Sequence, residues 1–317
     1  MSCPPEKIAA ESQPALEQTS TGLRAWASAK INLNLLVSPR RGDGFHPLDS
    51  LVAKITLYDR IDLTPRHDGR ITFSCNRRDC GSDEKNLALR AGLLLAQTAK
   101  TRPSRKLSLC GADIALVKNI PPGKGLGGGS SDAAGVMAGL NKLWQLGATS
   151  AALADIGASL GSDVPLFFGG TFSRITGRGE HVEPIALPDF WAVLCLPPLA
   201  TSTAEVYRTF DALAGKDSLG DVGKSPPAVD NGKPLIGPPS AWRELLRNDL
   251  LAPALRACPG LAEIHQALAQ ADPAVRLTGS GSAMFILCDD QAQAQRTLGR
   301  IAPSVANMCL IVRSQQA

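Results

Sequence analysis

The stretch Pro121-Pro-Gly-Lys-Gly-Leu-Gly-Gly-Gly-Ser-Ser-Asp-Ala-Ala134 holds five glycines within seven positions, between a Pro-Pro pair and an alanine-rich apolar run. Glycine lets the backbone adopt positive φ and approach a ligand closely. Ser130 or Ser131 is a suitable N-cap for a helix that runs on to Trp144. Because a glycine-rich loop at a helix N-terminus presents free N–H groups and the positive end of a dipole, this stretch predicts an anion site, most simply for phosphate.

The residues around these glycines exclude the common phosphate loops. The Gly-Lys pair of the stretch is not followed by Ser or Thr, so it is not a Walker-type loop. Gly123-x-Gly125-x-x-Gly128 matches the dinucleotide fingerprint, but nothing acidic lies between Asp132 and Asp155, where that fingerprint needs an acid. The protein-kinase loop needs a following Val and a later His-Arg-Asp, and both are absent. A flexible linker fits poorly with the Pro-Pro pair and the helix start.

Composition limits the classes of function. The 317 residues, 44% of them hydrophobic, suffice for two domains with a core each. A net charge of +4 without long Lys/Arg runs does not argue for nucleic acid, and an aromatic content of 4% weakens a base-stacking binder. No run approaches the roughly 18 apolar residues of a membrane span. We therefore expect neither nucleic acid nor a membrane as a partner.

Cysteine usage and the N-terminal residues bear on location. The eight cysteines are scattered without a Cys-x-x-Cys, so no zinc or redox spacing is visible. Residues 1–22 lack an apolar secretory region, and we expect reduced thiols and a cytoplasmic protein. The same residues are polar, with Pro and Glu, and are expected to form a disordered extension.

Polar side chains share one face of the first expected strand, Arg24–Val37. Alternate positions of this strand are apolar, while Lys30, Asn32 and Asn34 lie on the opposite face. An ordinary solvated face is one interpretation. Two asparagines are unusual in a strand, however, which favours a functional face.

Two loops carry further candidate residues. The turn Arg40–Pro47 ends on Phe45 and His46, and a histidine beside an aromatic on a loop is either structural or a ligand-binding group. Asp163 follows a helix expected over 151–160 and precedes Val-Pro. In isolation it is either a turn-forming aspartate or a functional one.

The remaining pattern predicts an α+β chain. Strands are expected over 52–63, 71–75, 113–118, 167–176 and 191–196, and helices over 86–100, 203–213, 242–256 and 261–270. Residues 215–239 hold ten Gly or Pro in 25 positions and predict a long flexible loop. The C-terminal order of helix, strand, loop, strand, helix and strand predicts a ferredoxin-like sandwich.

Three of these stretches together resemble the GHMP kinase superfamily. Its motifs are an N-terminal strand, a Pro-x-x-x-Gly-Leu-(Gly/Ser)-Ser-Ser phosphate loop and a C-terminal glycine loop. Pro122–Ser131 fits the second motif and Gly279-Ser-Gly-Ser-Ala283 the third. The resemblance runs from about Arg24 to the C-terminus. It implies a mixed α/β nucleotide-binding domain over 23–187 and a ferredoxin-like α+β domain over 188–317.

Within the superfamily, the chain is similar to the branch that uses ATP to phosphorylate the 2-hydroxyl of a cytidylyl sugar alcohol, on the non-mevalonate route to isoprenoid precursors. The stretches that carry this similarity are Ala29–Leu35, Arg41–His46, Gly127–Ala134, Leu160–Pro165 and Leu277–Ser282. Together they are specific, whereas any one of them alone is not.

The resemblance implies a role for each matching residue. Asp163 takes the proton from the attacking hydroxyl, Lys30 orients Asp163 and stabilises charge, and Asn32 positions the substrate. Phe45 and His46 hold the cytosine from one side, and Tyr207 lies on its other side. The residues implied at the nucleotide are Asn86, Lys118, Pro122, Gly123, Gly125, Leu126, Gly127, Gly128, Gly129, Ser130 and Ser131.

ATP and Mg²⁺ are the implied cofactors, in a monomer or weak homodimer. The sequence shows no dedicated carboxylate cage, so we expect the ATP phosphates, water and the hydroxyl of Ser130 or Ser131 to hold the Mg²⁺. Two departures from the pattern stand out. Phe45 occupies a position where tyrosine is commoner, and Lys124 lies in the glycine loop, where the family often has a small residue.

Two alternatives remain open. One is another kinase of the superfamily, of mevalonate or homoserine type, against which the Gly-Phe-His and Ala-Lys-Ile-Asn stretches argue. The other is a nucleotide-binding protein without catalysis, against which the presence of both Lys30 and Asp163 argues.

Overall fold

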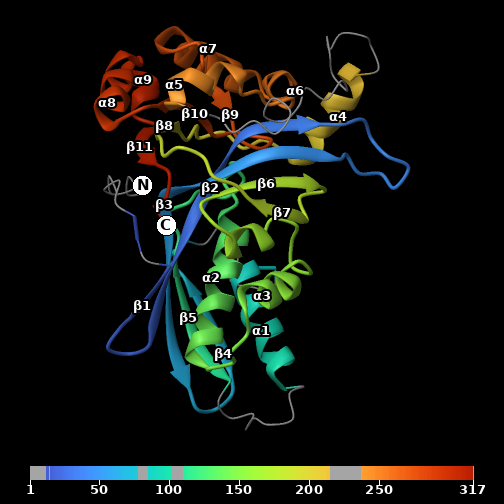
Figure 1. Ribbon diagram of the computed structural model, residues 1–317, viewed down its shortest axis with the longest axis vertical. Helices are drawn as coiled ribbons and strands as arrows, with labels where there is room; N and C mark the ends of the chain where they lie inside the picture. The colour runs from blue at the N-terminus through green and yellow to red at the C-terminus, as the bar shows by residue number, and fades with distance from the viewer. Residues whose placement is uncertain (1–11, 14, 78–84, 101–109, 215–236, 317) are drawn as a thin grey trace.

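One long hairpin runs through both halves of the molecule (Figure 1). Its strands, β2 (Leu23–Val37) and β3 (Leu48–Arg66), pair antiparallel, with irregularities of register between Ser28 and Ala29 and between Asn32 and Asn34. The computed structural model describes residues 12–13, 15–77, 85–100, 110–214 and 237–316. The strands predicted from alternation at both positions are confirmed, and β3 extends beyond its predicted ends.

The hairpin belongs to a sheet of seven strands. The order is β1-β2-β3-β5-β4, and β6 pairs with both β3 and β7. All neighbours are antiparallel except β4 and β5. The other strands are β1 (Leu16–Gln18), β4 (Ile71–Cys75), β5 (Gly111–Val117), β6 (Phe172–Gly177) and β7 (His181–Pro184).

Three helices gather beside the lower part of this sheet in Figure 1: α1 (Leu87–Lys100), α2 (Gly128–Leu143) and α3 (Ser150–Gly157). Helix α2 packs against β2 and β3, and α1 packs against α2. Small residues allow this approach: a Cβ on Gly139 would lie 2.2 Å from Leu63 Cδ1. The glycine loop is therefore held at the end of a helix whose apolar face is buried on the sheet.

The second sheet has four antiparallel strands in the order β11-β8-β10-β9. In chain order these are the fourth, first, third and second strands, which is the ferredoxin-like arrangement, so that prediction is confirmed. The strands are β8 (Trp191–Cys195), β9 (Arg276–Leu277), β10 (Met284–Cys288) and β11 (Cys309–Arg313). The helices of this half are α4 (Thr203–Ala214), α5 (Pro239–Trp242), α6 (Leu251–Ala257), α7 (Pro259–Ala271), α8 (Gln291–Arg300) and α9 (Pro303–Ala306).

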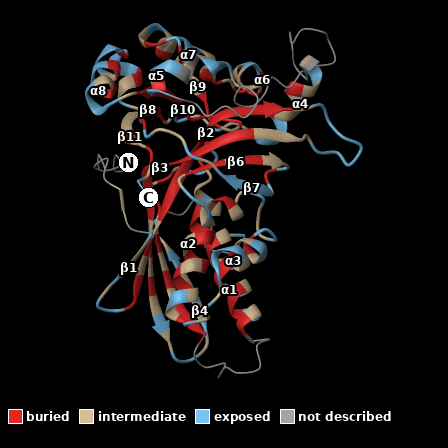
Figure 2. Ribbon diagram, in the orientation of Figure 1, coloured by how far each residue is buried: buried red, intermediate tan, exposed pale blue. Residues whose placement is uncertain are grey.

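Strand β2 passes through three cores in turn, and Figure 2 shows its buried residues along both halves. Ala25 and Ala27 belong to the core beneath α1 and α2. Ala29, Ile31 and Leu33 belong to a second core that they share with residues of β8, β10 and β11. This shared apolar core joins the two sheets, so the position of one half fixes the position of the other.

Two predicted elements are wrong. The predicted strand over 167–176 begins only at Phe172, because Pro165–Phe168 forms a 3₁₀ turn. The single helix predicted over 242–256 is broken: the backbone of Arg247 and Asp249 pairs with Leu35 of β2, and Asn248 donates to the carbonyls of Leu277 and Gly279, both at 2.8 Å. Backbone groups used in this pairing are lost to a helix.

The predicted disordered extension is wrong at its C-terminal end. Leu16–Gln18 forms β1 against β2, and the indole of Trp26 donates to Glu17 at 3.1 Å. Residues 1–11 and 14 lie outside the described residues, as does most of the predicted loop at 215–239. The domain boundary after residue 187 falls between β7 and β8 and stays a prediction.

Candidate active site

The glycine loop enters α2 without a side-chain cap. The N-cap residue is Gly127, with φ of 69° and no side-chain hydrogen bond, so the predicted serine N-cap is wrong. Ser130 and Ser131 lie within the first turn, where the Ser131 N–H donates to Gly127 O at 2.9 Å. The first N–H groups of a helix have no intrahelical acceptor, and here no side chain caps them. They are available to an anion.

A hollow of about 310 Å³ lies over this loop. Its walls include ten of the loop's residues in succession, Pro121 to Ser130, together with Leu87. Of the predicted nucleotide residues in the loop, only Ser131 is outside the lining, because it is buried. Asn86 caps α1 by accepting from Ala88 N at 2.9 Å, which places it next to Leu87 at the rim. Contact of these residues with a nucleotide stays a prediction.

The two glycine loops lie directly against one another. A Cβ on Gly125, whose φ is +76°, would lie 2.3 Å from Thr278 O, and one on Gly279 would lie 3.2 Å from Gly125 Cα. Contacts this short leave no room for a side chain. The Thr278 hydroxyl donates to Gly125 O at 3.3 Å and accepts from Asn32 N at 2.9 Å. Thr278 thus joins the phosphate loop, β2 and the second glycine loop.

A buried group of charges lies beneath the phosphate loop. The Lys118 ammonium, at the end of β5, pairs with Asp59 of β3 and with Asp132 of α2, the latter at 2.7 Å. Asp59 also accepts from the backbone N–H groups of Asn119 and Ile120, at 2.6 and 2.8 Å. Burial, and then the charge of Asp59, raise the pKa of Asp132 well above its usual range.

This charge cluster changes the interpretation of Lys118. Burial lowers the pKa of its ammonium, but the two carboxylates outweigh burial and the net shift is upward. A Cβ on Gly128 would lie 2.9 Å from Lys118 Nζ, so the ammonium is directly under the loop. The predicted role of Lys118 at the nucleotide stays a prediction, but its ammonium is engaged by carboxylates below the backbone.

The predicted polar face of β2 is buried beside the loop. The Lys30 ammonium donates to Asn32 Oδ1 at 2.6 Å, and the Asn32 amide donates to Ser50 Oγ at 2.8 Å. The Lys30 stem packs on the loop, since a Cβ on Gly127 would lie 3.0 Å from Lys30 Cγ. Burial lowers the pKa of Lys30, and the negative charge of Asp163 opposes that shift. The solvated face considered above is therefore excluded.

Asp163 lies in the turn between α3 and the 3₁₀ turn Pro165–Phe168 and is half-buried. Its charge acts on both Lys30 and Tyr207. The turn is held from below by Lys54, a residue that sequence reasoning missed. The Lys54 ammonium donates to the carbonyls of Phe167 and Gly169, at 3.1 and 2.7 Å. Burial lowers the pKa of Lys54 to about 8.

The aromatic candidates lie farther along the same groove of residues. His46 has its ring 5.3 Å from that of Tyr207; its Nδ1 donates to Ser38 O at 2.9 Å and its Nε2 lies 3.2 Å from the Asp211 carboxylate. Burial, and then the charge of Asp163, raise the pKa of Tyr207 to about 12. The structure thus brings His46 and Tyr207 together, and it connects Tyr207 with Asp163.

Phe45 is 51% exposed and stacks under a guanidinium that sequence reasoning missed. Arg178 lies 4.2 Å from the centre of the Phe45 ring. Its neighbour Gly179 is close to the catalytic candidate, because a Cβ there would lie 3.8 Å from Asp163 Oδ1. The turn between β6 and β7 therefore connects Phe45 with Asp163. The only sequence signal for it was a pair of glycines at 177 and 179.

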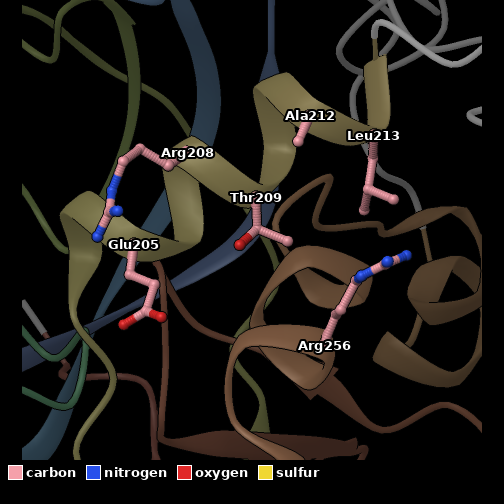
Figure 3. Close-up of a pocket in the computed structure, with 6 residues that line it drawn as sticks. All are labelled: Glu205, Arg208, Thr209, Ala212, Leu213 and Arg256. Atoms are coloured by element: carbon pink, nitrogen blue, oxygen red, sulfur yellow. The ribbon is translucent and has the colours of Figure 1, made fainter.

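A second pocket, of about 250 Å³, lies on α4 and α6 (Figure 3). Figure 3 shows Arg208 and Arg256 on different helices, not pointing toward one another. This pocket contains none of the predicted site residues. Within the described ranges, no three His, Cys, Asp or Glu side chains form a group that could hold a metal ion, and no helix there is long and apolar enough to span a membrane.

Comparison with known proteins gives matches over both halves. Residues 86–171 match the GHMP kinases N terminal domain, and residues 234–304 match GHMP kinases C terminal. A 4-diphosphocytidyl-2-C-methyl-D-erythritol kinase of Geobacillus sp. (strain WCH70) is 39% identical over 275 residues, which cover 85% of this chain and 89% of that protein.

Solved structures agree with these matches. A 4-(cytidine 5'-diphospho)-2C-methyl-D-erythritol kinase crystal structure is 32% identical, with a TM-score of 0.70, and the match covers 92% of this chain and all of that one. The L. major mevalonate kinase, solved in complex with R-mevalonate, has a TM-score of 0.66 over 97% of this chain and 99% of its own. At 14% identity, that second likeness shows the fold alone.

We predict that Lys118→Met destabilises the protein, because it leaves two carboxylates buried without a counter-ion. The expected loss is about 3–5 kcal/mol in the free energy of unfolding, measured by urea denaturation at neutral pH. Lys142→Met, on the exposed last turn of α2, is the control and should change stability by less than about 0.5 kcal/mol. Equal stability of the two variants would refute the role given to this charge cluster.

Proposed function

Because the chain belongs to the GHMP kinase superfamily, in the family of 4-diphosphocytidyl-2-C-methyl-D-erythritol kinases, we propose that it transfers the γ-phosphate of ATP to the 2-hydroxyl of that cytidylyl sugar alcohol. The reaction belongs to non-mevalonate isoprenoid precursor biosynthesis. One observation carries the proposal. The Lys30 ammonium, fixed on Asn32, packs beside the start of the phosphate-loop helix and within the field of Asp163.

The mechanism begins with the nucleotide in the hollow over the glycine loop. The uncapped N–H groups at the start of α2 bind phosphate oxygens, and the helix dipole favours the negative charge. Phosphoryl transfer has a loose transition state, so positioning and charge neutralisation supply most of the rate. The backbone of Gly127–Ser130 is already held for this task by Thr278, Lys30 and the charge cluster beneath it.

The acceptor hydroxyl attacks the γ-phosphorus in line with the bond to the departing ADP oxygen. The new O–P bond forms as the old one breaks, and the hydroxyl proton passes to the Asp163 carboxylate. Lys30 stabilises the negative charge on the transferred group, and Asn32 fixes Lys30 in place. Asp163 accepts the proton late, when the hydroxyl has become acidic in the transition state.

Mg²⁺ is part of the proposal and, when bound, neutralises charge on the ATP phosphates. The chain fits an ion held mainly by phosphates and water, because the hollow is lined by one hydroxyl, that of Ser130. Ser131 is buried, so of the two serines considered Ser130 is the better ligand. A cytoplasmic location and a monomer or weak homodimer are further parts of the proposal.

The cytosine end of the acceptor is proposed to bind near Phe45, His46 and Tyr207. Phe45 offers an exposed ring, and Tyr207 lies between His46 and the field of Asp163. Because Arg178 covers a face of Phe45, a base that stacks there either displaces the guanidinium or uses the other face. Aromatic stacking of a base is worth roughly 1–3 kcal/mol.

The direct test is an ATP-dependent phosphorylation assay with three acceptors: 4-diphosphocytidyl-2-C-methyl-D-erythritol, mevalonate and homoserine. We expect turnover of the first alone, with the new phosphate on its 2-hydroxyl. Turnover of mevalonate or homoserine instead would keep the phosphate loop and overturn the acceptor site. ATP binding without turnover of any acceptor would favour a non-catalytic nucleotide-binding protein.

Asp163→Asn should lower kcat by roughly 10²–10⁴-fold, since the amide cannot take the hydroxyl proton. Lys30→Met should cause a loss of similar order. Circular dichroism and the melting temperature would confirm that both variants fold. Asp155→Asn, on the exposed side of α3, is the matched control and should leave kcat unchanged. Near-wild-type turnover by Asp163→Asn would remove it from the role of base.

Replacing both Phe45 and Tyr207 with Ala should raise the KM for the cytidylyl acceptor far more than the KM for ATP. The expected rise is about 10- to 100-fold, from the loss of base stacking. Steady-state kinetics with each substrate varied in turn measures both constants in one variant, so ATP serves as the internal control. Equal effects on the two substrates would contradict the proposed cytosine site.

A further inference from the structure

Lys124 is the one basic residue within the glycine-rich run Gly123–Gly129, and its ammonium points away from the phosphate hollow. Nζ donates to Pro197 O at 2.7 Å, to Leu199 O, and to Ser282 Oγ at 3.2 Å. An ammonium has three donors, and here each has an acceptor. In the described part of the chain its partners are two carbonyls and a hydroxyl, with no carboxylate.

The acceptors of Lys124 belong to the opposite half of the molecule. Pro197 and Leu199 lie in the connection between β8 and α4, and Ser282 lies in the second glycine loop. Ser282 Oγ also donates to Leu199 O at 2.5 Å. The lysine side chain is buried, and burial lowers the pKa of its ammonium. A buried ammonium held by three convergent oxygens is a fixed contact between two segments rather than a mobile surface charge.

The backbone beside Lys124 is tied to the same segments. Ala283 N donates to Lys124 O at 3.2 Å, and the next residue, Gly125, has no space for a Cβ against Thr278. Gly123, in contrast, has nothing within 4 Å of an added Cβ. The loop therefore has a free edge at Gly123 and a pinned stretch at Lys124 and Gly125.

The pinned stretch leads toward the acceptor side of the site. Thr201 and Thr203, in the connection and at the start of α4, bond to Ser280 of the second glycine loop, at 3.1 and 2.8 Å. Helix α4 then carries Tyr207 against His46. A continuous set of hydrogen bonds thus runs from the phosphate loop through Lys124 and the 197–203 segment to the helix that carries Tyr207.

We propose that Lys124 is a positioning residue that fastens the nucleotide loop to the β8–α4 connection and the second glycine loop, and that its ammonium does not bind the ATP phosphates. It thereby fixes the distance between the phosphate loop and the helix that carries Tyr207. Its effect on turnover, though not its structural contact, rests on the proposed function. The alternative is the role that loop lysines play in other nucleotide-binding proteins, where the ammonium reaches the phosphates.

The test compares Lys124→Met, which keeps the length of the stem, with Lys142→Met as a matched control on an exposed turn of α2. Hydrogen–deuterium exchange of the ligand-free proteins is followed in peptides that cover 196–203 and 278–284. We expect exchange to quicken by about tenfold or more in Lys124→Met and to stay at the wild-type rate in Lys142→Met. Wild-type exchange in Lys124→Met would overturn the proposal.

Kinetics separates this contact from a phosphate ligand. We expect Lys124→Met to lower kcat by about tenfold while the KM for ATP stays within about threefold of wild type. A rise of about tenfold or more in the KM for ATP, with unchanged exchange, would assign the ammonium to the phosphates. If Lys124→Met fails to fold, Ser282→Ala removes one of its acceptors and is read in the same two ways. Failure of the wild-type protein to turn over any acceptor would count against the proposed function, while the exchange comparison would still decide the role of Lys124.

Discussion

The candidate site depends on the contact between two glycine-rich backbones from opposite halves of the chain. Gly125 lies so close to Thr278 that a Cβ would be 2.3 Å from its carbonyl oxygen. This contact, and the apolar core that β2 shares with β8 and β10, place the end of α2 beside the polar face of β2. A phosphate loop, a buried lysine and an aspartate from a distant turn can then act on one reacting group, since each is held on a fixed element.

Charge beneath the loop has a different purpose from charge beside it. Lys118 is neutralised by Asp59 and Asp132, all buried, and this cluster joins β3, β5 and α2 where the loop begins. Lys30 is also buried, but its close partner is the neutral Asn32, and Asp163 acts on it through its field. The first lysine is suited to holding the backbone, whereas the second keeps a positive charge that is available to a transferred phosphoryl group.

Sequence reasoning reached the elements with strong local patterns and the residues inside motifs. The alternation of β2, the α1 and α2 helices and the ferredoxin-like order were all readable, and so were Lys30, Asn32 and Asp163. The broken helix over 242–256 was not, because the pairing of Arg247 and Asp249 with Leu35 is a tertiary contact that overrides helical periodicity. Lys54, Arg178 and the carboxylates around Lys118 were missed for the same reason: each gains its partner from an element far away in the chain.

The central claim is that the acceptor hydroxyl lies between the phosphate loop and the Lys30–Asp163 pair. A crystal structure of the ternary complex with a non-hydrolysable ATP analogue and 4-diphosphocytidyl-2-C-methyl-D-erythritol tests it most directly. The account predicts phosphate oxygens on the backbone N–H groups that begin α2, and the 2-hydroxyl within about 3.2 Å of the Asp163 carboxylate and about 3–3.5 Å of the γ-phosphorus. A 2-hydroxyl bound out of reach of Asp163, with the triphosphate in place on the loop, would contradict it.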